Sequence, residues 1–125
     1  MSDPGERWEH GLDVYRAVYG DDAVVFEQGD AEFFDLMVSQ LFAEVWSRPG
    51  LALPARRLLV MGVLAAQHRY DALRAQFARA LATGELTAAQ VREVVIHLIP
   101  YVGYPSSGEL YRAGEDAITA ATEAT

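Results

Sequence analysis

The stretch RRLLVMGVLAAQHRYDALRAQFARALATGELTAAQVREVVIHLIPYVGYP, Arg56 to Pro105, decides the fold of this chain. Its apolar residues recur at steps of three and four in three successive segments, and this periodicity is typical of helices that bury one face. The last segment opens on Thr87 and Gln90, which have the spacing of a capping box. The stretch therefore predicts three consecutive helices.

The ends of these helices follow from cap and turn residues. Proline suits the first turn of a helix, so we expect the first helix to begin at Pro54 and to run to about His68. The second is expected to begin at Asp71 and to close at Gly84. In the third, Pro100 removes a backbone donor and should kink or end the helix. The residues expected to face inward are Leu58, Met61, Leu64, Ala65, Leu73, Phe77, Ala80, Leu81, Val91, Val94, Val95 and Leu98.

Two further helices are predicted on the N-terminal side. Asp3 is an N-cap followed by a proline, and Gly20 ends the helix that starts there. The stretch from Ala23 to Gly29 is interpreted as an extended connector, because the chain offers no second strand to pair with it. Asp30 then caps a helix that ends near Trp46. The residues expected to face inward are Trp8, Leu12, Tyr15, Tyr19, Phe33, Phe34, Met37, Leu41 and Val45.

A final helix is predicted after Ser106 and Glu109, which repeat the capping-box spacing. Its inward residues are expected to be Leu110, Ala113, Ala117 and Ile118. About six helices without a repeat predict an all-α, single-domain bundle. We expect one domain over residues 1–125, with an N-terminal helix and connector over 1–30 and a helical core over 31–125.

The size and charge of the chain limit its partners. A chain of 125 residues buries only part of its apolar surface alone, so the many apolar helix faces predict a homo-oligomer. A net charge of −8 repels phosphate backbones and anionic lipid, and we expect neither nucleic acid nor membrane as a partner. No apolar run approaches the ~20 residues of a membrane span, and the opening MSDPGERWEH lacks the order of a signal peptide. We therefore expect a cytoplasmic protein.

The composition also excludes several kinds of chemistry. The chain contains no cysteine, which removes thiolate nucleophiles, disulfides and dithiol redox cycles. All ten basic residues are arginines, so no lysine is present to form an imine with a carbonyl substrate. The three histidines share no close spacing, and we expect no metal site. No nucleotide-binding glycine loop or nucleophile elbow appears.

Polar residues that the apolar stripes do not explain are the first functional candidates. His97 lies four residues after Glu93 and four before Tyr101, where we expect a half-buried imidazole. The alternative is a histidine satisfied by one hydrogen bond at a helix contact. Arg56 and Arg57 lie in a first helical turn, where the helix dipole disfavours cations, so one of them is expected to answer to an anion. The alternative there is a surface ion pair.

A second group of candidates lies in EVWSRPGL, Glu44 to Leu51, where a helix stops at a Pro-Gly turn. This turn leaves the acid Glu44, the indole of Trp46 and the guanidinium of Arg48 close together in the chain. The octapeptide is either a helix end with a core tryptophan or one wall of a site.

Several motifs of the chain stand in the order of one known family. They are the opening RWEHGLDVYRAVYG, the WSRPGL turn, an R-x-L-x-x-x-x-x-L-A-A stretch, A-L-x-x-G and H-x-x-x-Y-x-G-x-P. With these motifs the chain resembles the gamma-carboxymuconolactone decarboxylase family over nearly its whole length. The resemblance implies an alkylhydroperoxidase D-like helical fold that uses no cofactor and assembles into trimers or hexamers, with sites near subunit contacts. It also implies a small anionic substrate, a lactone with two carboxylates from protocatechuate breakdown, which becomes an enol-lactone with loss of carbon dioxide.

That chemistry assigns roles to the candidates. Loss of a carboxylate leaves charge that spreads to the lactone carbonyl, so an enzyme needs donors at that oxygen and an acid for the carbon. We predict that Arg57 or Arg48 holds the substrate carboxylate, that His97 is the oxyanion or proton donor, and that Glu44 supports them. The residues predicted to line the substrate are Arg48, Trp46, Gln76 and Tyr101.

The chain departs from the family in two respects. Gln76 stands where the family commonly has a histidine, and an amide donates a hydrogen bond but does not shuttle a proton. The C-x-x-C dithiol of the alkylhydroperoxidase D group is missing, which excludes peroxidase activity of that type. Two alternatives therefore stay open: a family member that acts on a different lactone or oxo-acid, and a non-catalytic oligomeric binding or scaffold protein.

Overall fold

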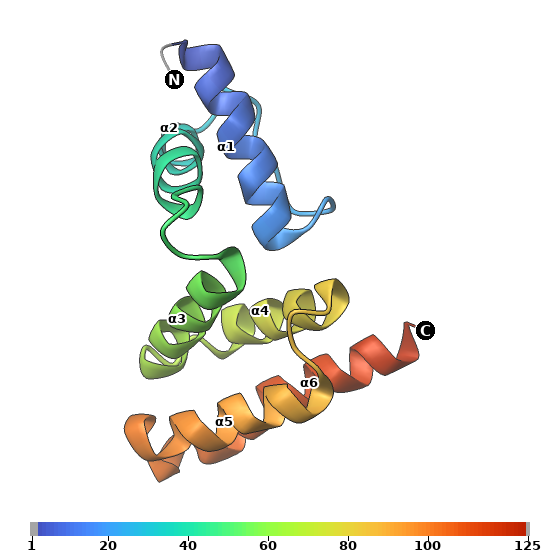
Figure 1. Ribbon diagram of the computed structural model, residues 1–125. Coiled ribbons are helices and arrows are strands. Elements are labelled where there is room, and N and C mark those ends of the chain that lie inside the picture. The colour runs from blue at the N-terminus through green and yellow to red at the C-terminus, as the bar shows by residue number, and fades with distance from the viewer. Residues whose placement is uncertain (1–2, 125) are drawn as a thin grey trace. The chain divides into compact units, whose positions relative to one another are not determined.

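Six α-helices, one π-helix and one short 3-10 helix make up the computed structural model, which describes residues 3–124 (Figure 1). No strand occurs among those residues, so the predicted all-α class is confirmed. None of these helices is both long and apolar enough to cross a membrane. The chain divides into two compact units, Met1–Arg56 and Arg57–Thr125, here called unit 1 and unit 2 and described separately.

Unit 1 pairs two long helical segments. α1 (Pro4–Tyr19) begins where expected, because the Asp3 side chain accepts a hydrogen bond from the Gly5 N–H at 3.0 Å. It ends at Gly20, whose φ of 101° favours glycine. After the connector, α2 (Glu32–Leu36) runs directly into the π-helix η1 (Met37–Trp46), which packs along α1 (Figure 1).

The buried face of the second segment agrees with the predicted one only at Phe34. Phe33, Leu41 and Val45 are exposed, whereas the residues one position further on form the core face. This face consists of Phe34, Val38, Phe42 and Trp46. The sequence holds two adjacent apolar stripes with the same spacing of four residues, so the spacing alone does not choose between them. α1 packs on the second stripe, where Tyr15 contacts the rings of Phe34 and Phe42.

Two contacts fix α1 against its neighbours. Gly11 lies against the Val38 backbone, because a Cβ atom at this position would come within 2.0 Å of the Val38 carbonyl oxygen. The Tyr15 hydroxyl donates a hydrogen bond to the Val24 carbonyl at 2.6 Å and so ties the connector to α1. Burial raises the pKa of this hydroxyl. The connector is irregular, as predicted.

Unit 2 is a group of helices around one core (Figure 1). α3 (Leu53–Ala66) enters it from unit 1, and α4 (Tyr70–Thr83), α5 (Ala88–Val102), the 3-10 helix η2 (Tyr104–Ser106) and α6 (Ser107–Glu123) follow. α6 packs against both α4 and α5. The core residues are Met61, Ala65, Leu73, Phe77, Ala80, Val91, Val95, Leu110, Ala113, Ala117 and Ile118.

The predicted helix ends in unit 2 are partly correct. Thr87 and Gln90 form the predicted capping box, with hydrogen bonds of 3.1 and 2.9 Å. Ser106 makes no such cap, because its hydroxyl lies instead 3.3 Å from Nδ1 of His68. α3 ends at Ala66 rather than near His68, whose left-handed φ of 58° breaks the helix. α5 continues through Pro100 to Val102 rather than stopping there.

Candidate functional site

Three polar side chains meet inside unit 2 and form the candidate site, called here the Arg57 cluster: Arg57, Gln76 and Glu85. Arg57 lies on α3 in line with Met61 and Ala65, on the face that packs into the core, and is 1% exposed. Gln76 reaches it from α4 and is 2% exposed. The predicted inward residue Leu58 is exposed instead. An arginine therefore occupies a core position of this helix.

The guanidinium of Arg57 holds both partners by direct hydrogen bonds. Its Nε donates to Oε1 of Glu85 at 2.8 Å and its Nη2 donates to Oε2 at 3.2 Å, which is a two-point fork between guanidinium and carboxylate. Its Nη1 donates to Oε1 of Gln76 at 2.7 Å. The anion that Arg57 answers to in this structure is the protein's own Glu85, in an ion pair that is partly buried rather than on the surface, and a ligand anion at Arg57 stays a prediction.

The turn after α4 brings Glu85 to this position. Gly84 ends the helix in the left-handed conformation, with φ of 78°, and Glu85 follows it directly. Thr83 then fixes the carboxylate, because its hydroxyl donates to Oε2 of Glu85 at 2.6 Å. The Leu86 N–H donates to the Ala80 carbonyl at 3.2 Å and closes the turn. Glu85 is thus held by its neighbours as well as by Arg57.

These contacts determine the charge of the cluster. Burial alone would raise the pKa of Glu85, but hydrogen bonds from Arg57 and Thr83 outweigh it and hold the pKa below the ordinary value. At neutral pH the carboxylate is therefore ionised and compensates the buried guanidinium. Gln76 orients the guanidinium through its amide oxygen and adds no charge.

The depressed pKa predicts that unit 2 loses stability in acid. The pair contributes its full stability above the ordinary pKa of 4.5 and loses it as the pH falls through the folded-state pKa, because the unfolded chain then binds more protons. We expect the urea midpoint of the wild type, followed by circular dichroism, to fall more steeply between about pH 5 and about pH 3 than that of E85Q.

A matched control is E115Q, because Glu115 also makes a two-point pair, with Arg92, at 2.9 and 3.0 Å. That pair lies on the surface, where ion pairs contribute little although the hydrogen bond from Arg92 also lowers the pKa of Glu115, so its removal should change the acid limb of the curve much less than E85Q does. If the urea midpoints of the wild type and of E85Q fall in parallel as the pH is lowered, the depressed pKa of Glu85 does not contribute to the stability of unit 2.

The other predicted site residues of unit 2 lie on α5. His97 is exposed, so the prediction of a half-buried imidazole is wrong. Its ring lies beside that of Tyr101, with centroids 5.4 Å apart, and Tyr101 is 81% exposed. The i, i+4 spacing therefore did bring the two rings together, but on the outer face of the helix rather than at its buried edge.

The predicted site residues of unit 1 contact other residues of the same unit. Glu44 is exposed and pairs with Arg7. Trp46 is buried, with its ring stacked on that of Phe42 at 6.1 Å, as expected for a core anchor. Arg48 is exposed, and its carbonyl accepts a hydrogen bond from Arg56 at 3.1 Å. A single site that joins these residues with the Arg57 cluster stays a prediction.

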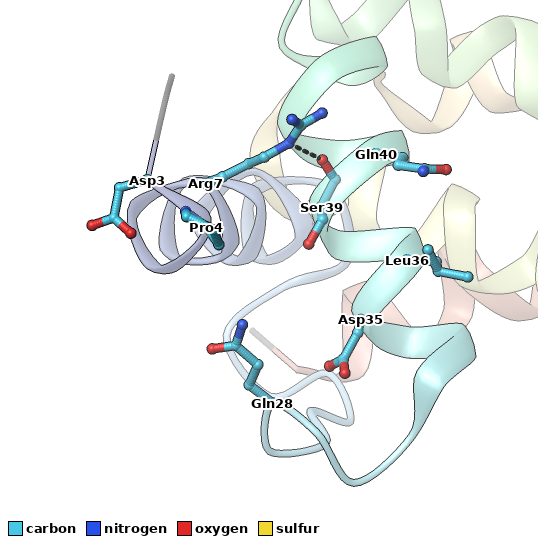
Figure 2. Close-up of a pocket in the computed structure, with 8 residues that line it drawn as sticks. All are labelled: Asp3, Pro4, Arg7, Gln28, Asp35, Leu36, Ser39 and Gln40. Carbon is cyan, nitrogen blue, oxygen red and sulfur yellow. Dashed lines mark hydrogen bonds between the residues drawn. The ribbon is translucent and has the colours of Figure 1, made fainter.

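Unit 1 also contains a cavity of about 350 Å³ (Figure 2). Arg7 forms one wall and donates a hydrogen bond from Nε to the Ser39 carbonyl at 2.9 Å. The lining residues are Asp3, Pro4, Arg7, Gln28, Asp35, Leu36, Ser39 and Gln40. None of the predicted site residues is among them. Within residues 3–124, no group of three or more histidine and acidic side chains is placed to hold a metal ion.

Comparison with known proteins identifies the family. The model of the carboxymuconolactone decarboxylase family matches residues 31–116. The chain belongs to the carboxymuconolactone decarboxylase family. The match covers all three residues of the Arg57 cluster and both rings on α5, as well as the Glu44–Arg48 segment.

Two relatives of known activity are similar to this family member over most of its length. One is the 4-carboxymuconolactone decarboxylase of Acinetobacter baylyi, which is 30% identical over 116 residues, 89% of this chain and 86% of the relative. The other is the nitrosuccinic acid decarboxylase of Metarhizium robertsii, 30% identical over 104 residues, 79% of this chain and 72% of the relative. No solved structure matches the chain significantly.

Sequence reasoning missed Glu85. It lies in a turn, 28 residues after Arg57, and no periodic pattern connects the two positions. The available signal was the unfavourable place of Arg57 at a helix start, which called for an anion but did not say which of the 18 acidic residues supplies it.

Proposed function

We propose that this chain is a cofactor-free decarboxylase that acts on a small carboxylated substrate, with 4-carboxymuconolactone as the first candidate. The observation that carries the proposal is that both relatives, one bacterial and one fungal, are named as decarboxylases although their named substrates differ. The reaction class is thus common to two relatives that are each 30% identical to this chain, whereas the substrate differs between them. The predicted cytoplasmic location belongs to the same proposal.

The two named substrates pose the same chemical problem. Each carries a carboxylate near a group that withdraws electrons, a lactone carbonyl in one and a nitro group in the other. When carbon dioxide leaves, the electron pair of the broken bond moves toward the oxygen atoms of that group, and a proton then reaches the carbon skeleton. The protein has to bind an anion, stabilise charge on oxygen and deliver a proton, and side chains are sufficient for all three tasks.

We assign each of these three tasks to particular residues of this chain. Arg57 binds a substrate carboxylate by the same fork contact that it makes with Glu85, and Gln76 keeps the guanidinium oriented. His97 donates the proton or stabilises the oxyanion, and its exposure leaves it free to face a substrate. Glu44, Arg48, Trp46 and Tyr101 are proposed, as before, to support and line the substrate.

A homo-oligomer, a trimer or hexamer as the family resemblance implies, completes the proposal. Leu58, Leu59 and Val63 give α3 an apolar outer surface, and Ile96 and Tyr101 do the same for α5. Apolar surface of this kind favours association with another copy of the chain. Light scattering at micromolar concentration tests this, and a monomer would contradict it.

The activity is tested by incubating the purified oligomer with 4-carboxymuconolactone and following ultraviolet absorbance. Release of carbon dioxide from nitrosuccinic acid is measured in parallel. Turnover of either compound supports a decarboxylase and identifies the preferred class of acid. Absence of turnover with both would contradict the proposed function for these two substrates.

His97→Ala is expected to lower kcat of the preferred substrate by about 100-fold, because the loss of one well-placed donor costs about 3 kcal/mol in the barrier. His10→Ala is the control, since His10 is exposed on α1 and has no proposed role. Its kcat should equal that of the wild type. Near-normal turnover by the His97 variant would remove this residue from the mechanism.

One observation favours the second candidate function, a non-catalytic binding or scaffold protein. Arg57 is already neutralised by Glu85, so the buried charge has a structural explanation without any substrate. The two candidates predict different effects of mutation at this pair. A scaffold needs the pair only for stability, whereas an enzyme needs Arg57 for turnover as well.

A further inference from the structure

The Glu85 carboxylate already occupies a carboxylate-binding position. Its two oxygens face Nε and Nη2 of Arg57 at 2.8 and 3.2 Å, which is the geometry that a guanidinium offers to any carboxylate, whether from the protein or from a ligand. Nη1 points elsewhere, to the Gln76 amide oxygen at 2.7 Å. The fork that could receive a ligand is thus the one that Glu85 now fills.

Exposure decides which member of the pair a ligand can replace. The Arg57 side chain is 1% exposed, whereas that of Glu85 is 11% exposed and lies on the turn after α4. Of the two partners, Glu85 is therefore the one that reaches solvent. A carboxylate that arrives from solvent meets Arg57 through the position of Glu85.

Charge balance makes this exchange selective. While Glu85 is in place its charge compensates that of Arg57, so a second anion at that position would itself lack a compensating charge and would be repelled by the Glu85 carboxylate. If a substrate carboxylate takes over the fork, Arg57 keeps its compensation and Glu85 regains water. A neutral group at that position would instead leave the guanidinium buried without an anion, which is strongly unfavourable.

From these contacts we propose that Glu85 is a specificity-determining residue, which a substrate displaces from Arg57 with a carboxylate other than the one that leaves as carbon dioxide. The inference rests on the proposed function, because it concerns the same substrate. In a substrate with two carboxylates, as the family resemblance implies, it assigns the retained carboxylate to Arg57 in the place of Glu85. Monocarboxylic analogues that lack the second group should bind weakly and turn over slowly.

The test is binding of succinate, an unreactive dicarboxylate, measured by calorimetry. E85Q keeps the size of the side chain but removes the competing charge, so succinate should bind at least about tenfold more tightly than to the wild type. E115Q, which breaks the surface pair with Arg92, should bind succinate as the wild type does. Unchanged or weaker binding by folded E85Q would overturn the inference and leave Glu85 a structural residue.

A second variant covers the case in which E85Q does not fold. Thr83→Ala leaves the ion pair intact and removes the 2.6 Å hydrogen bond that holds Oε2 of Glu85 in place, together with the longer contacts of the same hydroxyl to the Ala80 carbonyl and the Glu85 N–H. Displacement of Glu85 then becomes easier, and succinate should bind about threefold more tightly. Binding equal to the wild type in this variant would also contradict the inference.

Kinetics separate this inference from the proposed function. In the decarboxylase assay, E85Q should lower KM by about tenfold with little change in kcat, since the substrate no longer competes with a carboxylate. If no substrate turns over but E85Q still tightens succinate binding, the proposed reaction fails and the role of Glu85 stands. If turnover occurs and succinate binding does not tighten, the role of Glu85 fails alone.

Discussion

Gly11→Ala is expected to destabilise unit 1 by about 3 kcal/mol, at the upper end of what overpacking costs. An added Cβ would come within 2.0 Å of the Val38 carbonyl oxygen and 2.8 Å of its carbonyl carbon. Both atoms belong to the backbone of η1, so the strain is relieved only if the two helical segments move apart. Such movement would open the core between α1 and the aromatic side chains of η1.

Denaturation followed by tryptophan fluorescence measures this loss directly, because both tryptophans of the chain, Trp8 and Trp46, belong to unit 1. Gly5→Ala is the matched control in the same helix, where the new Cβ would meet nothing closer than a carboxylate oxygen at 3.6 Å. Alanine is the better helix former, so this variant should be as stable as the wild type or slightly more stable. Equal midpoints for the Gly11 variant and the wild type would show that the two segments do not approach so closely.

Several helix ends were predictable because single residues determine them, although Asp30 and Ser106, which were expected to act as caps, make no capping hydrogen bond. Asp3, Gly20 and Gly84 act through their own side chain or backbone freedom, and each ends or begins a helix where expected. Thr87 and Gln90 act as a pair only three residues apart. All of these signals are local, so no knowledge of the tertiary fold is needed to interpret them.

The buried face of η1 was not predictable in the same way. Phe33 and Phe34 are neighbours, as are Leu41 and Phe42, and each pair offers one apolar residue to either of two faces. Only the partner helix decides between the faces, and α1 meets the face of Phe34 and Phe42. Hydrophobic periodicity gives the existence of a helix more reliably than its orientation when two stripes run side by side.

One part of the candidate site was predictable from local sequence signals, and another part depends on tertiary packing. The position of Arg57 near the start of a helix called for an anion, and the structure supplies one from the protein itself, Glu85. The identity of the anion depends on a turn 28 residues away, which no local rule reaches. Likewise, the spacing of His97 and Tyr101 placed their rings together, but the surface to which they belong depends on how α5 packs in unit 2. Long-range pairing of polar groups is therefore the part of the site that sequence alone left open.

Gln76 shows how this pairing changes the interpretation of a family position. The sequence suggested that an amide in place of histidine removes a proton shuttle. In the folded chain the amide oxygen accepts a hydrogen bond from Arg57, a contact that a protonated histidine cannot make. Gln76 and Arg57 thus suit each other, and the acid-base role in the proposed reaction falls to a residue outside the cluster.

Arg57→Met is expected to lower the stability of unit 2 by about 3 kcal/mol, because it removes the ion-pair partner of the partly buried Glu85 carboxylate and leaves it only the Thr83 hydroxyl and the more distant charge of Arg79. Methionine fills a similar volume, so the loss reflects charge rather than a cavity. The orphaned group is Glu85, whose side chain is 11% exposed and gains only partial access to water. Thermal denaturation followed by circular dichroism measures the effect. If Arg57 binds the substrate carboxylate as proposed, kcat/KM also falls by about 100-fold or more, since loss of one partner from a desolvated charge pair costs about 2–5 kcal/mol.

The double variant R57M/E85M separates these two losses. Replacement of both charges by apolar side chains removes the uncompensated group, and buried ion pairs replaced in this way often leave stability unchanged or increased. We therefore expect the double variant to regain most of the stability of the wild type while its decarboxylase activity stays low. Recovery of stability together with activity would show that Arg57 and Glu85 serve only the fold, and the substrate carboxylate would then have to be assigned to a different arginine such as Arg48.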